Sequence, residues 1–379
     1  MEPYKYTVTN LKDLQPGSAT ARSFCEQLHR RSFAVIKLPV EALADITAVR
    51  NSASTFFALP ADSKRTAVGD FRQVGGTYAG YRDLAGSARQ SDCDAEFLEV
   101  HVDRAGAAVP APPEPPALAA AAAALHARLL AVARALLGLL ADHIQAPAGA
   151  LLDPVDPPSP ELLDEGQISS SVLRVCHYRA GGDGEAENGA GAGRGVLFAE
   201  HTDSALLTLS LLCPGAAGLE VCDASVSSDA ADDAGADPWV ALEELCPRHA
   251  ELDVEVHVGD FLAFLTRDYY PACCHRVLRP AGDAGRLSLP FLVRCRNDHV
   301  LDTRPYDPTS SNARLVEVHG VTCKELRLLF DARGKRLLEA ERDAAAAAAE
   351  KEEERKRRAR EYREALKAGK ALSDSSDED

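Results

Sequence analysis

Apolar and polar positions follow two different periods along this chain of 379 residues. In residues 42–57, and again in the Ala- and Leu-rich run 117–144, apolar positions recur at helical spacing, which predicts two helices. After Pro154 the pattern changes to short apolar runs separated by turn residues, which is typical of an all-β barrel or jelly roll. We therefore expect an α+β protein, with a double-stranded β-helix (jelly roll) core and a helical N-terminal region packed on it.

Composition divides the chain into three parts. Residues 1–152 are expected to form a mixed α/β region with the long Ala-rich helix, residues 153–330 the jelly roll, and residues 331–379 a charged C-terminal helix with an acidic tail. Residues 344–370 are almost entirely Ala, Glu, Lys and Arg, which favours a helix. They lack the apolar heptads of a coiled coil. We expect a solvated helix there, with weak binding of a protein partner as the alternative.

Charge and cysteine usage narrow the class of protein further. The net charge of -16 disfavours nucleic acid as a partner. Ten cysteines without paired spacing, and a polar start over residues 1–13, favour a cytoplasmic enzyme over a secreted one. His and charged residues interrupt the 117–144 run, so we expect a core helix there and no membrane span.

Two segments of low complexity interrupt the β-rich part. Gly181–Gly195 is Gly-rich and Asp223–Asp237 is rich in Ala, Ser and Asp. We expect both to be disordered loops. The second one lengthens the interval between two residues with metal-binding chemistry, Asp203 and His275, to 72 positions (275 minus 203).

Three side chains offer a set of metal ligands. His201 and Asp203 follow the apolar run 196–198, and on a strand of period two they share one face. His275 follows later and could lie on a neighbouring strand. Two histidines and one carboxylate form the facial triad of non-heme Fe(II) oxygenases, which leaves coordination positions open.

The spacing distinguishes this set from a second copy of the short motif. His101 and Asp103 repeat the same chemistry on another expected strand. Eleven residues after His275 comes Arg286, and Ser288 follows two positions later, whereas the earlier motif has no such continuation. The alternative, ordinary polar residues on half-buried strands, treats the whole ordered series as coincidence.

From about Ser169 to Asn297 the chain resembles the plant-type, isopenicillin N synthase-like branch of the 2-oxoglutarate and Fe(II)-dependent dioxygenases. A weaker likeness covers residues 32–38, 56–64 and 80–82. The segments that carry the main resemblance are LRVCHY (173–178), HTDSALLTL (201–209), GLEV (218–221), WV (239–240), VHVGDFLAF (256–264), HRV (275–277) and RLSLPFL (286–292).

The resemblance implies a reaction and a set of cofactors. It implies Fe(II), 2-oxoglutarate as co-substrate and O2, with oxidation of a small organic substrate, by default its hydroxylation, and release of succinate and CO2. Two alternatives stay open. One is an Fe(II) oxidase of the same fold that uses no 2-oxoglutarate, and the other is a non-catalytic metal-binding interaction protein.

The resemblance also assigns roles to six residues. His201, Asp203 and His275 would be the catalytic iron ligands. Arg286 and Ser288 share a strand face and offer a guanidinium fork and a hydroxyl to the distal carboxylate of 2-oxoglutarate, joined by Tyr178 from an earlier strand. Cys176 stands where the family often has Asn.

Other positions have less certain roles. Cys273 and Cys274 precede His275, and we expect them to be core or rim thiols rather than ligands. The sequence does not name the substrate. Candidates for the pocket lining are Phe198, Leu206, Phe291 and Arg294.

Overall fold

The chain divides into two compact units, Met1–Cys323 and Lys324–Asp379. The boundary expected at 152/153 therefore lies inside the first unit. The second unit is described only at residues 324–329, which are helical, so the expected 344–370 helix and the acidic tail lie outside the described residues. The computed structural model describes residues 5–74, 77–84, 95–112, 115–179, 195–213, 217–227, 238–246, 250–279, 285–304 and 319–329.

The largest sheet in the described part of the chain has ten strands and is antiparallel except for its β1–β2 edge. β14 lies in its middle, between β9 and β7. In spatial order the strands are β1 (Thr9–Asn10), β2 (Phe33–Lys37), β12 (Asp253–Val258), β9 (Leu207–Leu211), β14 (Arg286–Val293), β7 (Val172–Tyr178), β5 (Ala95–Val102), β4 (Thr77–Asp83) and β3 (Arg72–Val74), with β6 (Ala108–Val109) paired to β5.

A four-stranded sheet packs against the large one. Its order is β11 (Trp239–Ala241), β10 (Leu219–Cys222), β13 (His275–Leu278) and β8 (Val196–His201). Leu197 and Val277 of this sheet join Phe97 and Tyr178 of the large sheet in one buried apolar cluster. Two facing antiparallel sheets form the expected jelly roll, and the α+β fold class is confirmed. A third pair, β15 (Val300–Asp302) and β16 (His319–Thr322), is separate.

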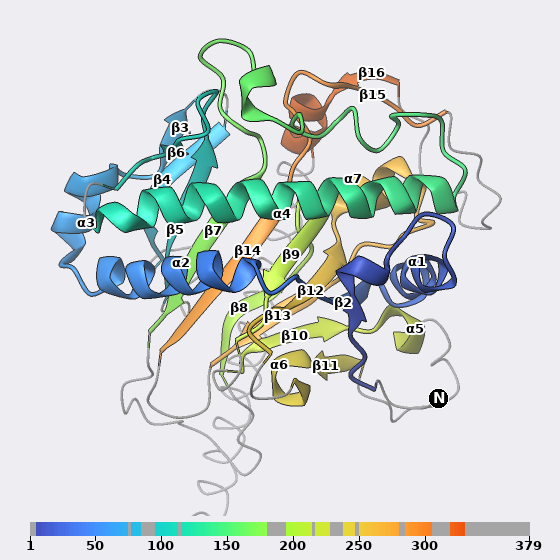
Figure 1. Cartoon of the computed structure of the whole chain (residues 1–379), viewed down its shortest axis with the longest axis horizontal. Helices are drawn as coiled ribbons and strands as arrows, with labels where there is room; N and C mark the ends of the chain where they lie inside the picture. Colours follow the sequence, from blue (N-terminus) through green and yellow to red (C-terminus); the bar gives the residue numbers. More distant parts are fainter. Residues whose placement is uncertain are drawn as a thin grey trace, which may run out of the picture. The chain divides into compact units, whose positions relative to one another are not determined.

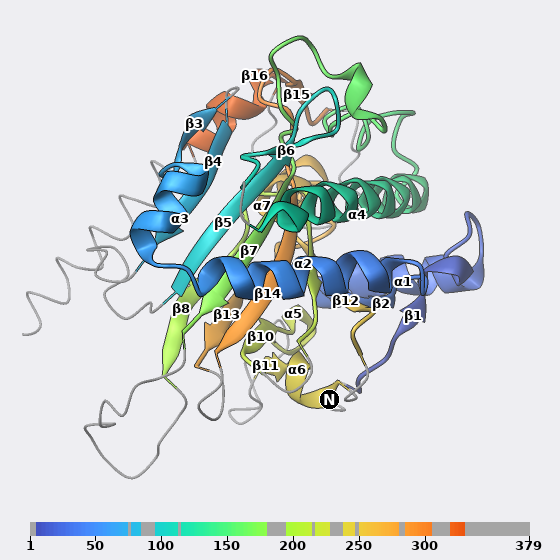
Figure 2. The same cartoon turned by 60° about the vertical axis from the view of Figure 1, so that its left-hand side comes forward.

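Two helices, α2 (Ala42–Phe57) and α4 (Pro116–His143), run side by side across one face of the large sheet (Figures 1 and 2). Both match the predicted ranges within a residue. α4 is long and apolar enough to cross a membrane by length and composition, but core helices pass the same test. Its buried positions recur at helical spacing: Leu118, Ala122, Leu125, Leu129, Leu136 and Leu140. This burial against the sheet agrees with a core helix.

The remaining helical segments are short, except α1. They are η1 (Leu11–Asp13), α1 (Ala19–Arg31), α3 (Ala61–Val68), η2 (Pro160–Leu162), α5 (Ala224–Ser227), α6 (Leu242–Leu245) and α7 (Asp260–Leu265).

The structure changes the picture of the second low-complexity segment. We expected disorder from residue 223 onward, but residues 224–227 form α5, and buried Asp223 pairs with Arg31. The ion pair of Asp223 and the helical turn at residues 224–227 therefore give the start of this segment a defined structure. The rest of that segment, and residues 181–194 of the Gly-rich one, lie outside the described residues.

Candidate active site

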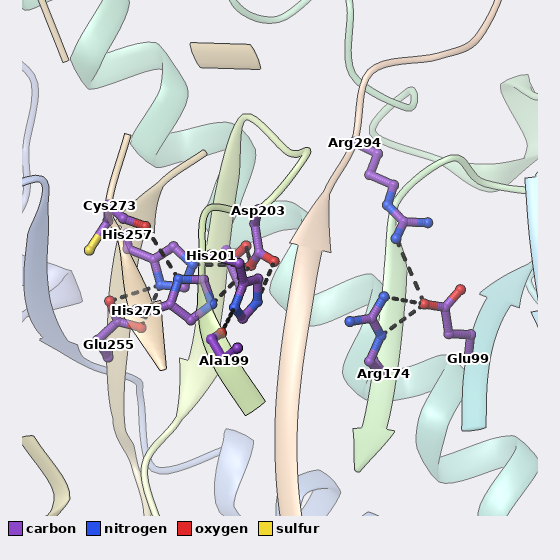
Figure 3. Close-up of polar contacts among 11 residues, drawn as sticks. Glu99, Arg174, Ala199, His201, Asp203, Glu255, His257, Cys273, His275 and Arg294 are labelled. Atoms are coloured by element: carbon purple, nitrogen blue, oxygen red, sulfur yellow. Dashed lines mark hydrogen bonds and ion pairs between the residues drawn. The ribbon is translucent and has the colours of Figure 1, made fainter. Parts of the chain in front are cut away.

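His201 and His275 meet where β8, an edge strand of the small sheet, pairs with β13. His201 ends β8, His275 begins β13, and their Cα atoms are register partners. Asp203 follows β8 after one residue. One ligand atom from each of the three side chains lies within 4.8 Å of the others. Figure 3 shows the three side chains converging. The structure thus brings together the three residues that the sequence pattern selected.

Backbone contacts orient both imidazoles. His201 Nδ1 lies 2.8 Å from the Ala199 carbonyl oxygen, and His275 Nδ1 lies 3.3 Å from that of Cys273. A proton on each Nδ1 can be donated to these oxygens, which leaves the Nε2 lone pairs available. Each Nε2 points toward the carboxylate of Asp203, at 3.8 Å for His201 and 3.9 Å for His275.

Burial sets the charges of this group. It lowers the pKa of His201, and together with the nearby His257 it lowers the pKa of His275 to about 3, so both rings are neutral near pH 7. Burial alone would raise the pKa of Asp203, but the surrounding histidines hold it well below its usual value. Two neutral imidazoles and one carboxylate are the ligand forms that a divalent iron needs.

Thr208 and His257 occupy one oxygen of the Asp203 carboxylate. Thr208 Oγ1 donates to Oδ2 at 2.6 Å, and His257 Nε2 lies 3.1 Å from the same atom. Oδ1 is the oxygen that faces His201. The arrangement therefore suits a carboxylate that binds a metal through one oxygen.

A second polar group lies further along the same cavity. The Cα atoms of Arg286 and Tyr178 are register partners on β14 and β7, and Ser288 pairs with Cys176. The guanidinium of Arg286 lies over the Tyr178 ring, 5.3 Å from its centroid. The pairing of β14 with β7 is seen on both sides of Pro290, so this proline is accommodated inside a central strand.

A buried carboxylate that the sequence did not reveal holds Arg286. Glu243 of α6 accepts from Arg286 Nε at 3.0 Å and from Nη2 at 2.8 Å. The third nitrogen, Nη1, is buried and has no hydrogen-bond partner among the described residues. An unsatisfied buried guanidinium nitrogen is costly, which makes Nη1 a receptor for an anion.

Glu243 itself is completely satisfied. Its carboxylate also accepts from the backbone N–H groups of Cys213, Gly218 and Leu219. Gly218 lies so close to Arg286 that a Cβ there would come within 3.1 Å of its Cδ. No spacing or alternation in LEEL (242–245) distinguishes this Glu from the next one.

Both polar groups line one cavity between the two sheets. It runs along β14 from Arg286 to Leu292, and Leu292 is the register partner of Thr208, which bonds Asp203. One end thus holds an anion receptor and the other holds the His and Asp group.

The comparisons with known proteins agree with this geometry. The sequence profile of the 2OG-Fe(II) oxygenase superfamily matches residues 169–294, which include all six predicted site residues. Residues 169–294 therefore form a domain of this superfamily. The enzyme is a 2-oxoglutarate-dependent dioxygenase that uses Fe(II), 2-oxoglutarate and O2. No curated protein sequence matches the chain.

Solved structures of oxygenases share the fold. Neurospora crassa T7H, in complex with alpha-KG and 5-formyluracil, is 19% identical with a TM-score of 0.61, over 85% of this chain and 94% of T7H. The rice dioxygenase for auxin oxidation is 18% identical with a TM-score of 0.57, over 87% and 96%. JOX2, in complex with 2OG, Fe and JA, is 18% identical with a TM-score of 0.62, over 86% and 85%.

The oxygenase has a further charged group in its cavity wall. Arg174, which shares a face of β7 with Cys176 and Tyr178, lines the cavity. Its Nε and Nη2 atoms lie 2.8 and 2.5 Å from Glu99 Oε1, and Arg294 lies 3.7 Å from the same oxygen. Figure 3 shows this group beside the histidines. The alternation of Arg174 with Leu173 and Val175 is the sequence signal that marks it.

The other expectations about the cavity hold in part. Phe198 lines it, but Leu206, Phe291 and Arg294 do not; the first two are completely buried, and Arg294 pairs with Glu99, the partner of the lining residue Arg174. Cys273 is a core thiol in a cluster with Phe33. Leu206 and Phe291 therefore follow the other interpretation that the sequence left open, in which they belong to the barrel core.

Proposed function

We propose that this oxygenase hydroxylates a small, largely apolar organic molecule that carries an anionic group. Fe(II) would be held by His201, Asp203 and His275. The distal carboxylate of 2-oxoglutarate would be bound by Arg286 Nη1, Ser288 and Tyr178. The observation that carries the cofactor assignment is the buried, unpartnered Nη1 at the end of the cavity opposite the ligand group.

The case for an anionic group in the substrate rests on the charge around Arg174. Burial alone would raise the pKa of Glu99, but Arg174 and Arg294 lower it, so two guanidiniums face one carboxylate. The net charge of that trio is +1. Arg174 Nη1 makes no hydrogen bond with the described residues, so it can donate into the cavity. Apolar neighbours, including Phe97, Phe198 and Val277, complete the wall.

The position of Arg174 separates the substrate from the co-substrate. It lies four residues before Tyr178 on β7, or ~13 Å along the strand. Arg286 pairs with Tyr178, whereas Arg174 lies at the level of the metal ligands. Two anions could therefore bind at once without sharing a cation. T7H, which is in complex with 5-formyluracil, and the rice dioxygenase for auxin oxidation are consistent with this size of ligand.

The chain's residues supply placement, while bound Fe(II) with 2-oxoglutarate and O2 supplies the oxidising power. Arg286, held by Glu243, orients the co-substrate along β14. Arg174 orients the substrate beside His201 and Asp203. The apolar wall excludes water from the position where the C–H bond is exposed to oxidation.

A paired-substrate assay tests the proposal. Small carboxylic acids, each with its methyl ester, are screened for stimulation of succinate formation from 2-oxoglutarate. We expect acids to be preferred, and Arg174→Gln to raise the KM of the best acid about 10- to 150-fold, because a charge-assisted hydrogen bond contributes about 1.5–3 kcal/mol.

The matched control is the KM for the co-substrate, which Arg174→Gln should leave unchanged. Equal stimulation by acids and esters would disprove the anionic substrate. Absence of succinate formation with every substrate, together with no binding of the co-substrate, would disprove the assigned 2-oxoglutarate site.

A further inference from the structure

Polar and apolar side chains alternate along β12, which begins at Asp253. Glu255 and His257 alternate with Val254, Val256 and Val258, so they share one face. Both are at most 1% exposed. The two oxygens of Glu255 lie 3.0 and 2.9 Å from His257 Nδ1. A buried carboxylate and a buried imidazole are thus linked on the face that looks toward the metal ligands.

His257 contacts two of the three proposed ligands at once. Its Nε2 lies 3.1 Å from Asp203 Oδ2, and its ring lies 4.5 Å from the ring of His275, centroid to centroid. Figure 3 shows Glu255 and His257 next to the ligand group. No other described His touches the ligands in this way; His101 and His126 contact Ser169, Ser171 or Tyr78 instead.

His257 donates a hydrogen bond to Asp203 whether Glu255 or His257 carries the proton that lies between them. If Glu255 is protonated, it donates to Nδ1 and the neutral ring carries its hydrogen on Nε2. If Glu255 is ionised, a bare Nε2 would place its lone pair against the ionised carboxylate of Asp203, so Nε2 is protonated as well. In both cases His257 donates to Oδ2.

The same segment fixes the backbone of Asp203. Its carbonyl oxygen accepts from the N–H groups of Asp260 and Ala205, each at 2.8 Å. Gly259 permits this approach, since a Cβ there would lie 2.2 Å from the Ala205 oxygen and 2.8 Å from that of Asp203. Residues 255–260 therefore hold both the main chain and the carboxylate of one ligand.

We propose that His257, backed by Glu255, is a positioning residue that occupies Asp203 Oδ2 and so directs Oδ1 alone to the metal. The inference rests on the proposed iron site. A carboxylate held in this way keeps one coordination position open that a bidentate carboxylate would fill. Partners in the outer shell of a metal site change metal affinity about 10- to 100-fold.

Binding of Co(II), without 2-oxoglutarate and without O2, tests the role independently of turnover. His257→Leu removes the donor at similar volume, and we expect about 10- to 100-fold weaker binding by calorimetry. The d–d absorption of bound Co(II) should change as well, because its intensity depends on coordination number. His257→Gln can place an amide N–H near the Nε2 position and should restore affinity to within about threefold of the wild type.

The chain offers its own control in His101, a buried histidine that contacts backbone carbonyls of Ser169 and Tyr78. His101→Leu should bind Co(II) as the wild type does, with the same spectrum. Unchanged affinity and an unchanged spectrum in His257→Leu would overturn the inference. If instead Asp203→Ala binds Co(II) as tightly as the wild type, the iron site itself is misassigned.

A second variant covers the case in which His257→Leu does not fold, as judged by circular dichroism and thermal melting. Glu255→Gln keeps the shape and removes the charge behind the ring. About tenfold weaker Co(II) binding in this variant supports the role, whereas wild-type affinity and spectrum would refute it.

Discussion

His101 of β5 and His201 of β8 each begin a His-x-Asp sequence, but their ring nitrogens have different surroundings. Both nitrogens of His101 contact backbone carbonyls, at 2.7 Å for Ser169 and 2.9 Å for Tyr78. His201 has only Nδ1 engaged in this way, and its Nε2 faces Asp203. The carboxylate of Asp103 accepts the backbone N–H groups of its own turn.

The comparison shows that the His-x-Asp sequence alone does not identify a metal-binding group. What identifies it is a set of ring nitrogens and carboxylate oxygens that the fold itself does not use in hydrogen bonds. In the first copy both ring nitrogens of the histidine contact backbone carbonyls and the carboxylate closes its own turn, so this copy stabilises the fold. The second leaves two Nε2 lone pairs and one carboxylate oxygen directed at a common point. Substitutions in both copies and at Arg286 test this distinction, in order of decreasing effect.

The largest effect is expected from the two aspartates. Asp203→Ala should abolish succinate formation and weaken Co(II) binding by more than about 100-fold, since outer-shell partners alone contribute up to that factor. Asp103→Ala should leave both unchanged and lower only the melting temperature. Equal loss of metal in the two variants, measured by calorimetry, would remove the distinction between the two motifs.

The next largest effect is expected at Arg286. Its Nη1 has no hydrogen-bond partner among the described residues, whereas both ring nitrogens of His101 contact backbone carbonyls. Arg286→Gln should weaken co-substrate binding by about 10- to 150-fold, because a charge-assisted bond contributes about 1.5–3 kcal/mol. It also leaves Glu243 buried without its counter-charge, at a cost of about 3–5 kcal/mol in unfolding free energy.

A double variant separates these two consequences. Arg286→Gln combined with Glu243→Gln should recover much of the lost stability in urea unfolding, but not the affinity for the co-substrate. Recovery of both would mean that Arg286 only supports the fold.

The smallest effect is expected from His101→Leu. A neutral imidazole has one N–H to donate, so this substitution leaves one backbone carbonyl in the core without its donor, which should lower the free energy of unfolding by about 1–3 kcal/mol. The KM for the co-substrate should not change in the folded protein. A large rise in that KM, with an intact melting transition, would show that β5 contributes to the site directly.

The sequence predicted much of the fold because the periods of its apolar positions are clear. The range 42–57 matches α2, and the run 117–144 matches α4 to within a residue. The ordered structure at Asp223 was harder to predict. Arg31 stabilises it from a position 192 residues earlier, and local composition carries no sign of such a partner.

The candidate site divides in a similar way. His201, Asp203 and His275 were found because ligand chemistry demands their types and order. Glu255 and His257 were visible as polar residues that alternate with valines, but only the tertiary structure shows what they contact. Glu243 had no sequence signal, because its role comes from one turn of helix that places it beside β14.

The ion pair between Glu243 and Arg286 also affects the thermodynamics of co-substrate capture. A free arginine side chain has about 2 kcal/mol of rotamer entropy to lose when it is fixed on a ligand. Here Glu243 fixes the guanidinium in the folded protein, so that entropy is lost during folding rather than during binding. Co-substrate capture then resembles docking into a rigid receptor, with an association rate set by diffusion into the cavity rather than by rearrangement of its walls.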